Sequence, residues 1–243
     1  MLGIPLFILL KMTKKVFLAH RGSWHRHAIE NTIEAFEKTK NRLSNHLHGF
    51  ECDLRQLDHK NPHSWIIFHD ETMDRFSNNS STINPSIPII SKQQTSKIPT
   101  LKIFTDWIEK LTLPIIINIE IKHGSIKGIK TLINALINAN KHHLVTFIYS
   151  SFDKDVMNYL SSIKLNFSYL IKDINDFKNL NITDQTSAQF IGIRHDRATP
   201  LIFNHLKKIK ISAGIYFKDK HQYITNIDKV MNNDIISCIF IED

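Results

Sequence analysis

The sequence predicts an α/β barrel built as one domain. Short apolar runs of strand length alternate with helix-like runs along most of the chain, which is typical of βαβ units and a parallel sheet. The length of 243 residues is ordinary for a single barrel of this kind. Four apolar runs end in charged residues, and in a parallel barrel such ends meet on one rim. We therefore expect a barrel with a polar site at that rim.

The expected elements follow one another in regular order. The strand candidates are residues 16–20, 49–54, 65–69, 115–121, 145–150, 167–171, 190–193, 211–217 and 238–241. The helix candidates are residues 32–43, 100–111, 126–140, 153–163, 200–208 and 223–232. Nine strands exceed by one the eight of a closed barrel, and the pattern leaves open which is extra. The interval 55–64 is too short for a crossover helix, so we expect a somewhat distorted barrel with a degenerate crossover between its second and third strands.

The barrel domain is expected to span residues 12–243. Residues 2–10 are apolar, but no basic residue precedes them and three lysines follow, unlike a signal peptide or a membrane anchor. Residues 1–11 are therefore either an N-terminal extension or a mis-assigned start, with Met12 as the natural beginning. Residues 71–99 form a Ser/Asn/Pro-rich insertion without periodicity, which is typical of a functional or mobile loop.

Composition limits the classes of partner. Lys and Arg total 31 against 23 Asp and Glu, a formal charge of +8, but the basic residues are spread along the chain. This favours an anionic ligand only weakly and predicts no nucleic-acid partner. Cys52 and Cys238 form no Cys-x-x-Cys or zinc pattern, so a disulfide framework is not expected and a cytoplasmic location fits best.

The four charged strand ends contain a recurring set of residue types. They are His20-Arg21-Gly22, Glu51-x-Asp53, His69-Asp70 and Glu120-x-Lys122. Residues two apart on a strand share a face, so each carboxylate pair or ion pair points one way. Taken singly, each has an ordinary explanation: a capping histidine, a solvated strand face, or an ion pair.

Their joint occurrence favours a site. Three carboxylates that converge repel one another unless a cation compensates, and oxygen ligands suit Mg²⁺ or Ca²⁺ better than zinc. Two histidines beside such an ion suggest an acid and a base, while Arg21 and Lys122 could bind a phosphate.

At this point the chain resembles the glycerophosphodiester phosphodiesterases, a family of TIM-type (β/α)8 barrels. The similarity runs over residues 16–152 and thins beyond them. It is carried by His20-Arg21-Gly22, Glu30-Asn31-Thr32, Ala35-Phe36, Glu51-x-Asp53, His69-Asp70 with Arg75, Ile98-Pro99-Thr100-Leu101, Glu120-x-Lys122 and Ser150-Ser151-Phe152.

The resemblance implies a role for each matching residue. His20 and His69 are expected to be the general base and general acid, and Arg21 and Lys122 to contact the phosphate. The implied ligands of one divalent cation, Mg²⁺ or Ca²⁺, are Glu51, Asp53 and Glu120. Glu30 and Asn31 are expected to support the loop after the first strand. The implied substrate is a glycerophosphodiester, a small molecule that is hydrolysed to glycerol 3-phosphate and an alcohol.

The chain also departs from the family pattern. The family's Thr-Lys-Asp-Gly turn after the second strand is replaced by a stretch without glycine, in which Asn61-Pro62 still predicts a turn. Tyr216 stands where the family has tryptophan, as an aromatic wall for the alcohol. Two alternatives stay open: a lysophospholipase D-like activity at a membrane surface, and a non-catalytic phosphoester-binding barrel. Membrane contact is not favoured, and the pattern gives no oligomeric state.

Overall fold

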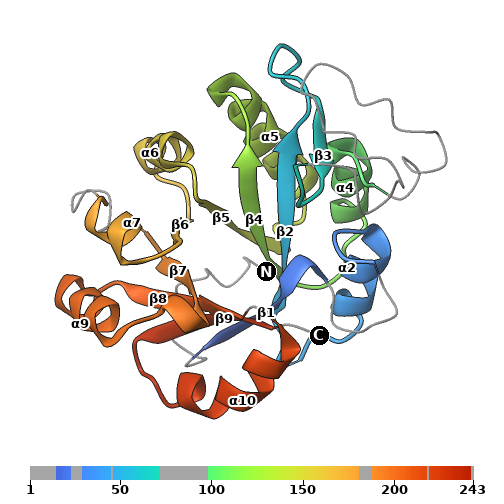
Figure 1. The fold of residues 1–243 in the computed structure, drawn as a ribbon. Helices are drawn as coiled ribbons and strands as arrows, with labels where there is room; N and C mark the ends of the chain where they lie inside the picture. The colour runs from blue at the N-terminus through green and yellow to red at the C-terminus, as the bar shows by residue number, and fades with distance from the viewer. Residues whose placement is uncertain are drawn as a thin grey trace, which may run out of the picture.

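The protein is an eight-stranded parallel barrel with its helices on the outside (Figure 1). The computed structural model describes residues 15–22, 29–44, 46–71, 98–180, 188–217 and 219–241. The strands are β1 (Val16–Ala19), β2 (Gly49–Gln56), β3 (Trp65–Ile67), β4 (Ile115–His123), β5 (Val145–Ser151), β6 (Phe167–Ile171), β7 (Phe190–Arg194), β8 (Ser212–Tyr216) and β9 (Ile236–Ile241). Parallel pairing of β1 with both β2 and β9 closes the ring, which confirms the predicted TIM-type barrel.

The ninth strand, β3, lies outside the ring. It pairs antiparallel with β2, with Leu54 opposite Ile67. The expected degenerate crossover at this point is wrong, because the short interval forms a hairpin that reverses the chain instead of a connection to a parallel strand. The turn predicted at Asn61-Pro62 is present, and Ser64 donates its backbone N–H to the Asn61 carbonyl at 3.1 Å.

Side-chain caps fix where the surrounding helices begin. The described α-helices are α2 (Ile33–Lys40), α4 (Leu101–Ile108), α5 (Ile126–Ala139), α6 (Lys154–Ser162), α7 (Ile174–Lys178), α9 (Pro200–Ile209) and α10 (Lys220–Met231). Before each one, a Ser, Thr or Asp side chain accepts a hydrogen bond from a backbone N–H of the first turn. Six helices confirm predicted ones, whereas α7 was not predicted because five residues are too few to show a periodic pattern.

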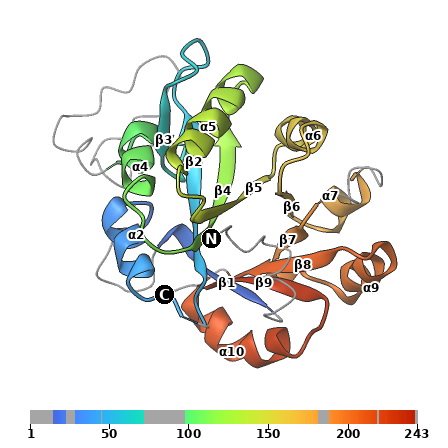
Figure 2. The ribbon, with the colours of Figure 1, turned by 180° about the vertical axis from the view of Figure 1, so that it is seen from behind.

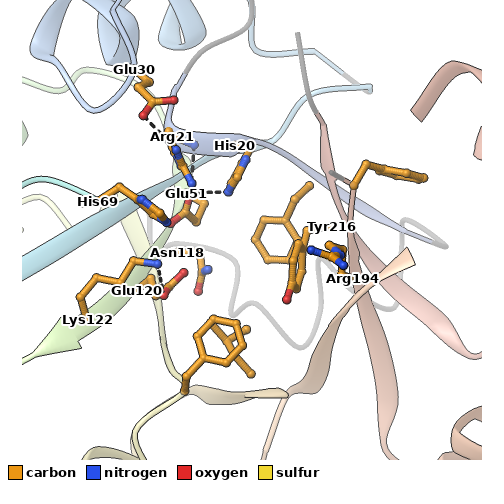
Figure 3. Close-up of a pocket in the computed structure, with 14 residues that line it drawn as sticks. His20, Arg21, Glu30, Glu51, His69, Asn118, Glu120, Lys122, Arg194 and Tyr216 are labelled. Carbon is orange, nitrogen blue, oxygen red and sulfur yellow. Dashed lines mark hydrogen bonds and ion pairs between the residues drawn. The ribbon is translucent and has the colours of Figure 1, made fainter. Parts of the chain in front are cut away.

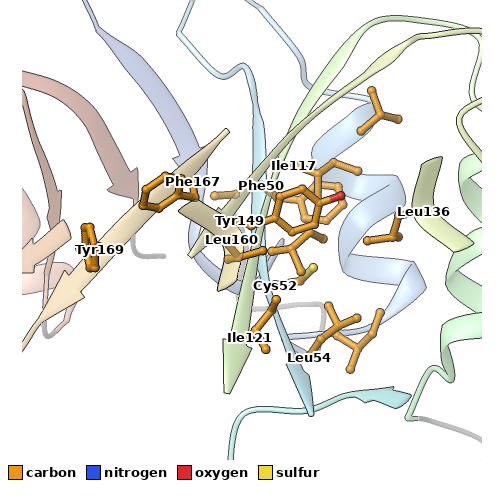
Figure 4. Packing of buried hydrophobic residues seen from close by; sticks show 14 of the residues in the cluster. Phe50, Cys52, Leu54, Ile117, Ile121, Leu136, Tyr149, Leu160, Phe167 and Tyr169 are labelled. Atoms are coloured by element: carbon orange, nitrogen blue, oxygen red, sulfur yellow. The ribbon is translucent and has the colours of Figure 1, made fainter. Parts of the chain in front are cut away.

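The main core lies between the barrel and the helices (Figure 2). Figure 4 shows Phe50, Cys52 and Leu54 of β2 among these buried side chains. The Phe36 ring of α2 stacks on Phe50 with centroids 4.2 Å apart. Because side chains alternate along a strand, this outward packing turns Glu51 and Asp53 into the barrel. Cys52 therefore faces the helices.

A second apolar cluster fills the barrel beneath the site. Its buried members are Val16, Leu18, Ile116, Ile148, Phe190, Cys238 and Phe240. The barrel interior is thus filled with apolar side chains below the site and opens into a pocket above them. None of the described helices is long and apolar enough to span a membrane. Residues 1–14, which include the expected extension, and residues 72–97 of the expected insertion, which include Arg75, lie outside the described ranges.

Candidate active site

A pocket of about 570 Å³ opens at the carboxyl ends of the barrel strands (Figure 3). Its lining residues are His20, Arg21, Glu30, Glu51, His69, Asn118, Glu120, Lys122, Phe152, Leu170, Arg194, Tyr216, Phe217 and Phe240. Eight of the ten residues that the sequence predicted for the site line it directly. The other two, Asp53 and Asn31, are buried beside the pocket and hydrogen-bonded to each other.

Three buried carboxylates converge at this pocket. Glu51 and Asp53 extend from β2, and Glu120 extends from β4, where it lies opposite Asp53 in the strand register. One oxygen from each lies within 4.8 Å of the others. Their exposed fractions are 2%, 0% and 7% respectively. The predicted acidic cluster is therefore brought together by two neighbouring strands.

Two cations only partly compensate these carboxylates. The Lys122 ammonium lies 3.1 Å from Asp53 Oδ1 and also contacts Glu120. Arg21 Nε lies 3.5 Å from Asp53 Oδ2, while the Arg21 backbone N–H donates to Glu51 Oε2 at 2.9 Å. Glu51 Oε1 is buried and accepts no hydrogen bond from the part of the chain that the structure describes.

Burial and mutual repulsion shift the pKa values of the three carboxylates in different directions. Burial and the charge of Asp53 raise the pKa of Glu51 to about 8. The same two causes raise the pKa of Glu120. Burial would also raise the pKa of Asp53, but Lys122 and Arg21 outweigh it and hold that pKa below its usual value. The cluster is short of positive charge for full ionisation at neutral pH.

The two histidines reach the cluster from different elements. His20 begins the short 3₁₀ turn η1 (His20–Gly22) after β1, and its Nε2 lies 3.7 Å from Glu51 Oε2. His69 follows β3, and its Nδ1 lies 2.7 Å from Asp70 Oδ1. Burial lowers the pKa of His69, although Asp53 acts in the opposite direction.

The expected route of His69 to the site is wrong in one respect. Its strand was expected to end on the rim in parallel with the others, yet β3 runs antiparallel to β2. The hairpin extends above the rim and then returns, so His69 enters the pocket from outside the ring. Arg55 Nη2 donates to the His69 carbonyl at 3.0 Å, and this hydrogen bond fixes the returning segment of the hairpin.

Glu30 contacts Arg21, in the loop after the first strand, whereas the side chain of Asn31 contacts Asp53 of β2. Asn31 donates from Nδ2 to Asp53 Oδ2 at 2.7 Å and accepts from the Asp53 backbone N–H at 3.1 Å. Glu30 accepts from Arg21 Nη1 at 2.9 Å. Arg21 and Asn31 both have positive φ angles, of 54° and 58°, so each adopts a left-handed backbone conformation that is uncommon for residues other than glycine.

Several lining residues were not predicted as site residues. Asn118 lies two positions before Glu120 on β4, and the same period-of-two rule could have identified it. Its Nδ2 donates to Ser150 Oγ at 3.1 Å. Arg194 ends β7 as a charged residue after an apolar run, which is the signal that marked the other strand ends. The centroid of the Phe152 ring lies 5.9 Å from the Lys122 ammonium, and Phe152 lines the pocket beside it.

Comparison by sequence gives no relative: no protein-family model and no curated protein matches this chain. Comparison by structure does. A glycerophosphodiester phosphodiesterase from Agrobacterium tumefaciens matches with a TM-score of 0.63 at 17% identity, covering 93% of this chain and 95% of that one.

Two further solved structures agree. A glycerophosphoryl diester phosphodiesterase from Parabacteroides distasonis matches with a TM-score of 0.64 at 14% identity, covering 98% of this chain and 88% of that one. An Oleispira antarctica phosphodiesterase in complex with the product sn-glycerol-3-phosphate matches with a TM-score of 0.64 at 15% identity, covering 95% and 94%. The chain thus has the barrel fold of solved glycerophosphodiester phosphodiesterases.

Proposed function

We propose that the protein is a metal-dependent phosphodiesterase that hydrolyses glycerophosphodiesters to glycerol 3-phosphate and an alcohol. The observation that carries this proposal is the convergence of Glu51, Asp53 and Glu120 within 4.8 Å in a pocket that also holds two histidines. The fold shared with phosphodiesterases supports the same reaction class.

The donor set fits a hard divalent cation. Its atoms are carboxylate oxygens, which Mg²⁺ and Ca²⁺ prefer. Glu51 Oε1 lacks a hydrogen-bond donor among the described residues, so this oxygen is available to a ligand. The raised pKa values of Glu51 and Glu120 indicate that added positive charge would stabilise their ionised forms. Glu51, Asp53 and Glu120 are therefore the proposed ligands.

A bound divalent cation would act as a Lewis acid on the phosphate and lower the pKa of the attacking hydroxyl group. The chain's own residues supply the rest of the chemistry. Arg21 and Lys122 bind the phosphate and stabilise the charge that builds on its oxygens in the transition state. The ion pair with Glu30 positions Arg21 for this role. Lys122 is positioned by its ion pairs with Asp53 and Glu120.

The histidines move the protons. His20 accepts the proton of the attacking hydroxyl, from water or from the neighbouring glycerol hydroxyl, as the new O–P bond forms. His69 donates a proton to the alcohol oxygen as the old P–O bond breaks. Asp70 orients the His69 ring through the 2.7 Å contact at Nδ1, which leaves Nε2 for the substrate. If the glycerol hydroxyl attacks first, water opens the cyclic phosphate with the two histidines in exchanged roles.

The test is release of glycerol 3-phosphate from glycerophosphocholine and glycerophosphoinositol, and of acylglycerol 3-phosphate from lysophosphatidylinositol, by the purified protein. Each assay is run with Mg²⁺, with Ca²⁺ and with a chelator. We expect metal-dependent release from the water-soluble diesters. His20→Ala and His69→Ala should each lower kcat by about 10²-fold to 10⁴-fold, the usual contribution of a general acid or base. Glu120→Gln should lower activity and weaken metal dependence together.

Matched control variants lie outside the pocket. Glu109 pairs with Lys141 at 3.1 Å on the surface, so Glu109→Gln controls for Glu120→Gln. His142 is exposed after α5, so His142→Ala controls for the histidine variants. Both controls should keep wild-type activity. Release from lysophosphatidylinositol alone would favour the lipid substrate class, and no release from any diester with either metal would refute the proposed hydrolysis.

A further inference from the structure

The pocket has two chemically different halves. One half holds the carboxylates, the histidines, Arg21 and Lys122. The other half is lined by Phe152, Leu170, Arg194, Tyr216, Phe217 and Phe240. Figure 3 shows Arg194 and Tyr216 across the pocket from His69 and Lys122. A phosphate bound beside Lys122 would therefore direct one of its substituents toward the second half.

Arg194 is held rigidly at the edge of this second half. Its Nε donates to Asp196 Oδ1 at 2.6 Å and its Nη2 donates to Asp196 Oδ2 at 3.1 Å. This two-point contact fixes the plane of the guanidinium group and uses neither proton of Nη1. The hydrogen bond with Asp196 also raises the pKa of Arg194, so the group stays cationic.

Tyr216 adds a neutral donor next to this cation. Arg194 and Tyr216 lie opposite each other in the register of β7 and β8. Burial, followed by the charge of Glu120, raises the pKa of Tyr216 to about 12. Its hydroxyl group therefore keeps its proton at neutral pH and can donate a hydrogen bond to an anion.

In the part of the chain that the structure describes, the second half lacks a carboxylate that would balance a cation. Among the described residues that line this half there is no carboxylate, because Asp196 holds Arg194 from outside the lining set. A quaternary ammonium such as choline would face Arg194 without a counter-charge. A phosphate or carboxylate would instead meet a guanidinium fork and a phenol, both of which are donors suited to anions.

We propose that Arg194 and Tyr216 bind a second anionic group on the alcohol portion, so that the preferred substrates are glycerophosphodiesters whose alcohol carries a phosphate or carboxylate. This inference rests on the proposed function and names its substrate class. The two residues determine specificity and take no part in the proton transfers.

The experiment compares kcat/KM for three diesters with one glycerophosphate core: the choline, inositol and inositol 4-phosphate esters. Their alcohol portions carry positive, zero and negative charge. We expect wild type to prefer the inositol 4-phosphate ester. Arg194→Gln, which keeps a polar side chain but removes the charge, should lower kcat/KM for that ester by about tenfold. For the uncharged inositol ester the change should be less than about threefold.

Arg197→Gln is the matched control. Arg197 ends the short 3₁₀ turn η2 (His195–Arg197) that directly follows Arg194, and it is exposed, but it does not line the pocket. This variant removes the same charge and should leave the ratio between the esters unchanged. An equal effect of Arg197→Gln, or a wild-type preference for the choline ester, would overturn the inference while leaving the hydrolase proposal intact. Hydrolysis of none of the three esters would refute both.

Discussion

Glu51 is the residue whose ionisation is most affected by the fold. It is buried beside Asp53, and its pKa of about 8 means that the metal-free folded protein holds a proton there at neutral pH. In the unfolded chain this carboxyl would titrate near its ordinary value of about 4.3. The folded state therefore binds a proton that the unfolded state lacks between these two pH values. Stability from this group is present below the lower value and is lost as pH rises through the upper one.

We accordingly expect the free energy of unfolding of the metal-free protein to fall, relative to Glu51→Gln, as pH rises from about 5 to 8. The glutamine resembles the protonated carboxyl and cannot titrate, so it removes this contribution alone. The difference in the free energy of unfolding between the two proteins should change by at most about 1.4 kcal/mol for each pH unit. Urea unfolding of both proteins in chelator at several pH values measures it.

Added Mg²⁺ or Ca²⁺ should reverse the trend for wild type, since a cation stabilises the ionised carboxylates, and should do so less for the variant. Curves for the two proteins that stay parallel across this range would show that Glu51 does not titrate as described.

At the scale of elements, β2 contributes to both the site and the core, because its side chains point alternately into the barrel and toward the helices. Gly49 begins this strand where it passes close to β4, and a Cβ atom at this position would collide with the backbone carbonyl of Ile116. Phe50 then faces the helices and Glu51 the barrel. The close approach of β2 and β4 is also what brings Asp53 opposite Glu120 in the register.

Gly49→Ala should therefore lower the free energy of unfolding by about 3 kcal/mol or more, because backbone cannot move aside as a side chain can. Gly192→Ala is the comparison, since the added Cβ would collide only with the flexible end of Leu170 and would lie at ordinary contact distance from the Tyr169 carbonyl. We expect that variant to lose no more than about 1 kcal/mol. Chemical denaturation of the two variants beside wild type tests the difference, and equal losses would contradict a backbone clash at Gly49.

At the scale of the whole molecule, the alternation of strand-like and helix-like runs, together with the chain length, was enough to predict the barrel. The eight ring strands and six of the seven described helices appear where the periodicity indicated. The extra strand could not be identified because β3, Trp65–Ile67, is as apolar as a ring strand. Its direction depends on the hairpin, which local pattern does not specify. Glu51, Asp53 and Glu120 were predictable since each lies on a strand whose flanking positions, which face the opposite way, are apolar.

Arg194 was missed for the opposite reason. A single arginine that ends a strand is common on protein surfaces, and only the closed ring shows that β7 delivers it to the same pocket as β2 and β4. Long-range closure, which brings residues 20 and 194 to one cavity, is not encoded in any local window of sequence.

The two histidines come from different elements and flank Glu51 in Figure 3, and this arrangement has a stereochemical consequence. If His20 and His69 act as the proposed base and acid on either side of phosphorus, each displacement proceeds in line, with inversion of configuration. A phosphorothioate diester of known handedness, hydrolysed in isotopically labelled water, would record the number of displacements. Net inversion indicates direct attack by water, and net retention indicates two successive displacements through the glycerol hydroxyl. A racemic product would contradict the proposed placement of the two histidines on opposite sides of the phosphorus. The handedness of the product therefore preserves a record of how the barrel positions them.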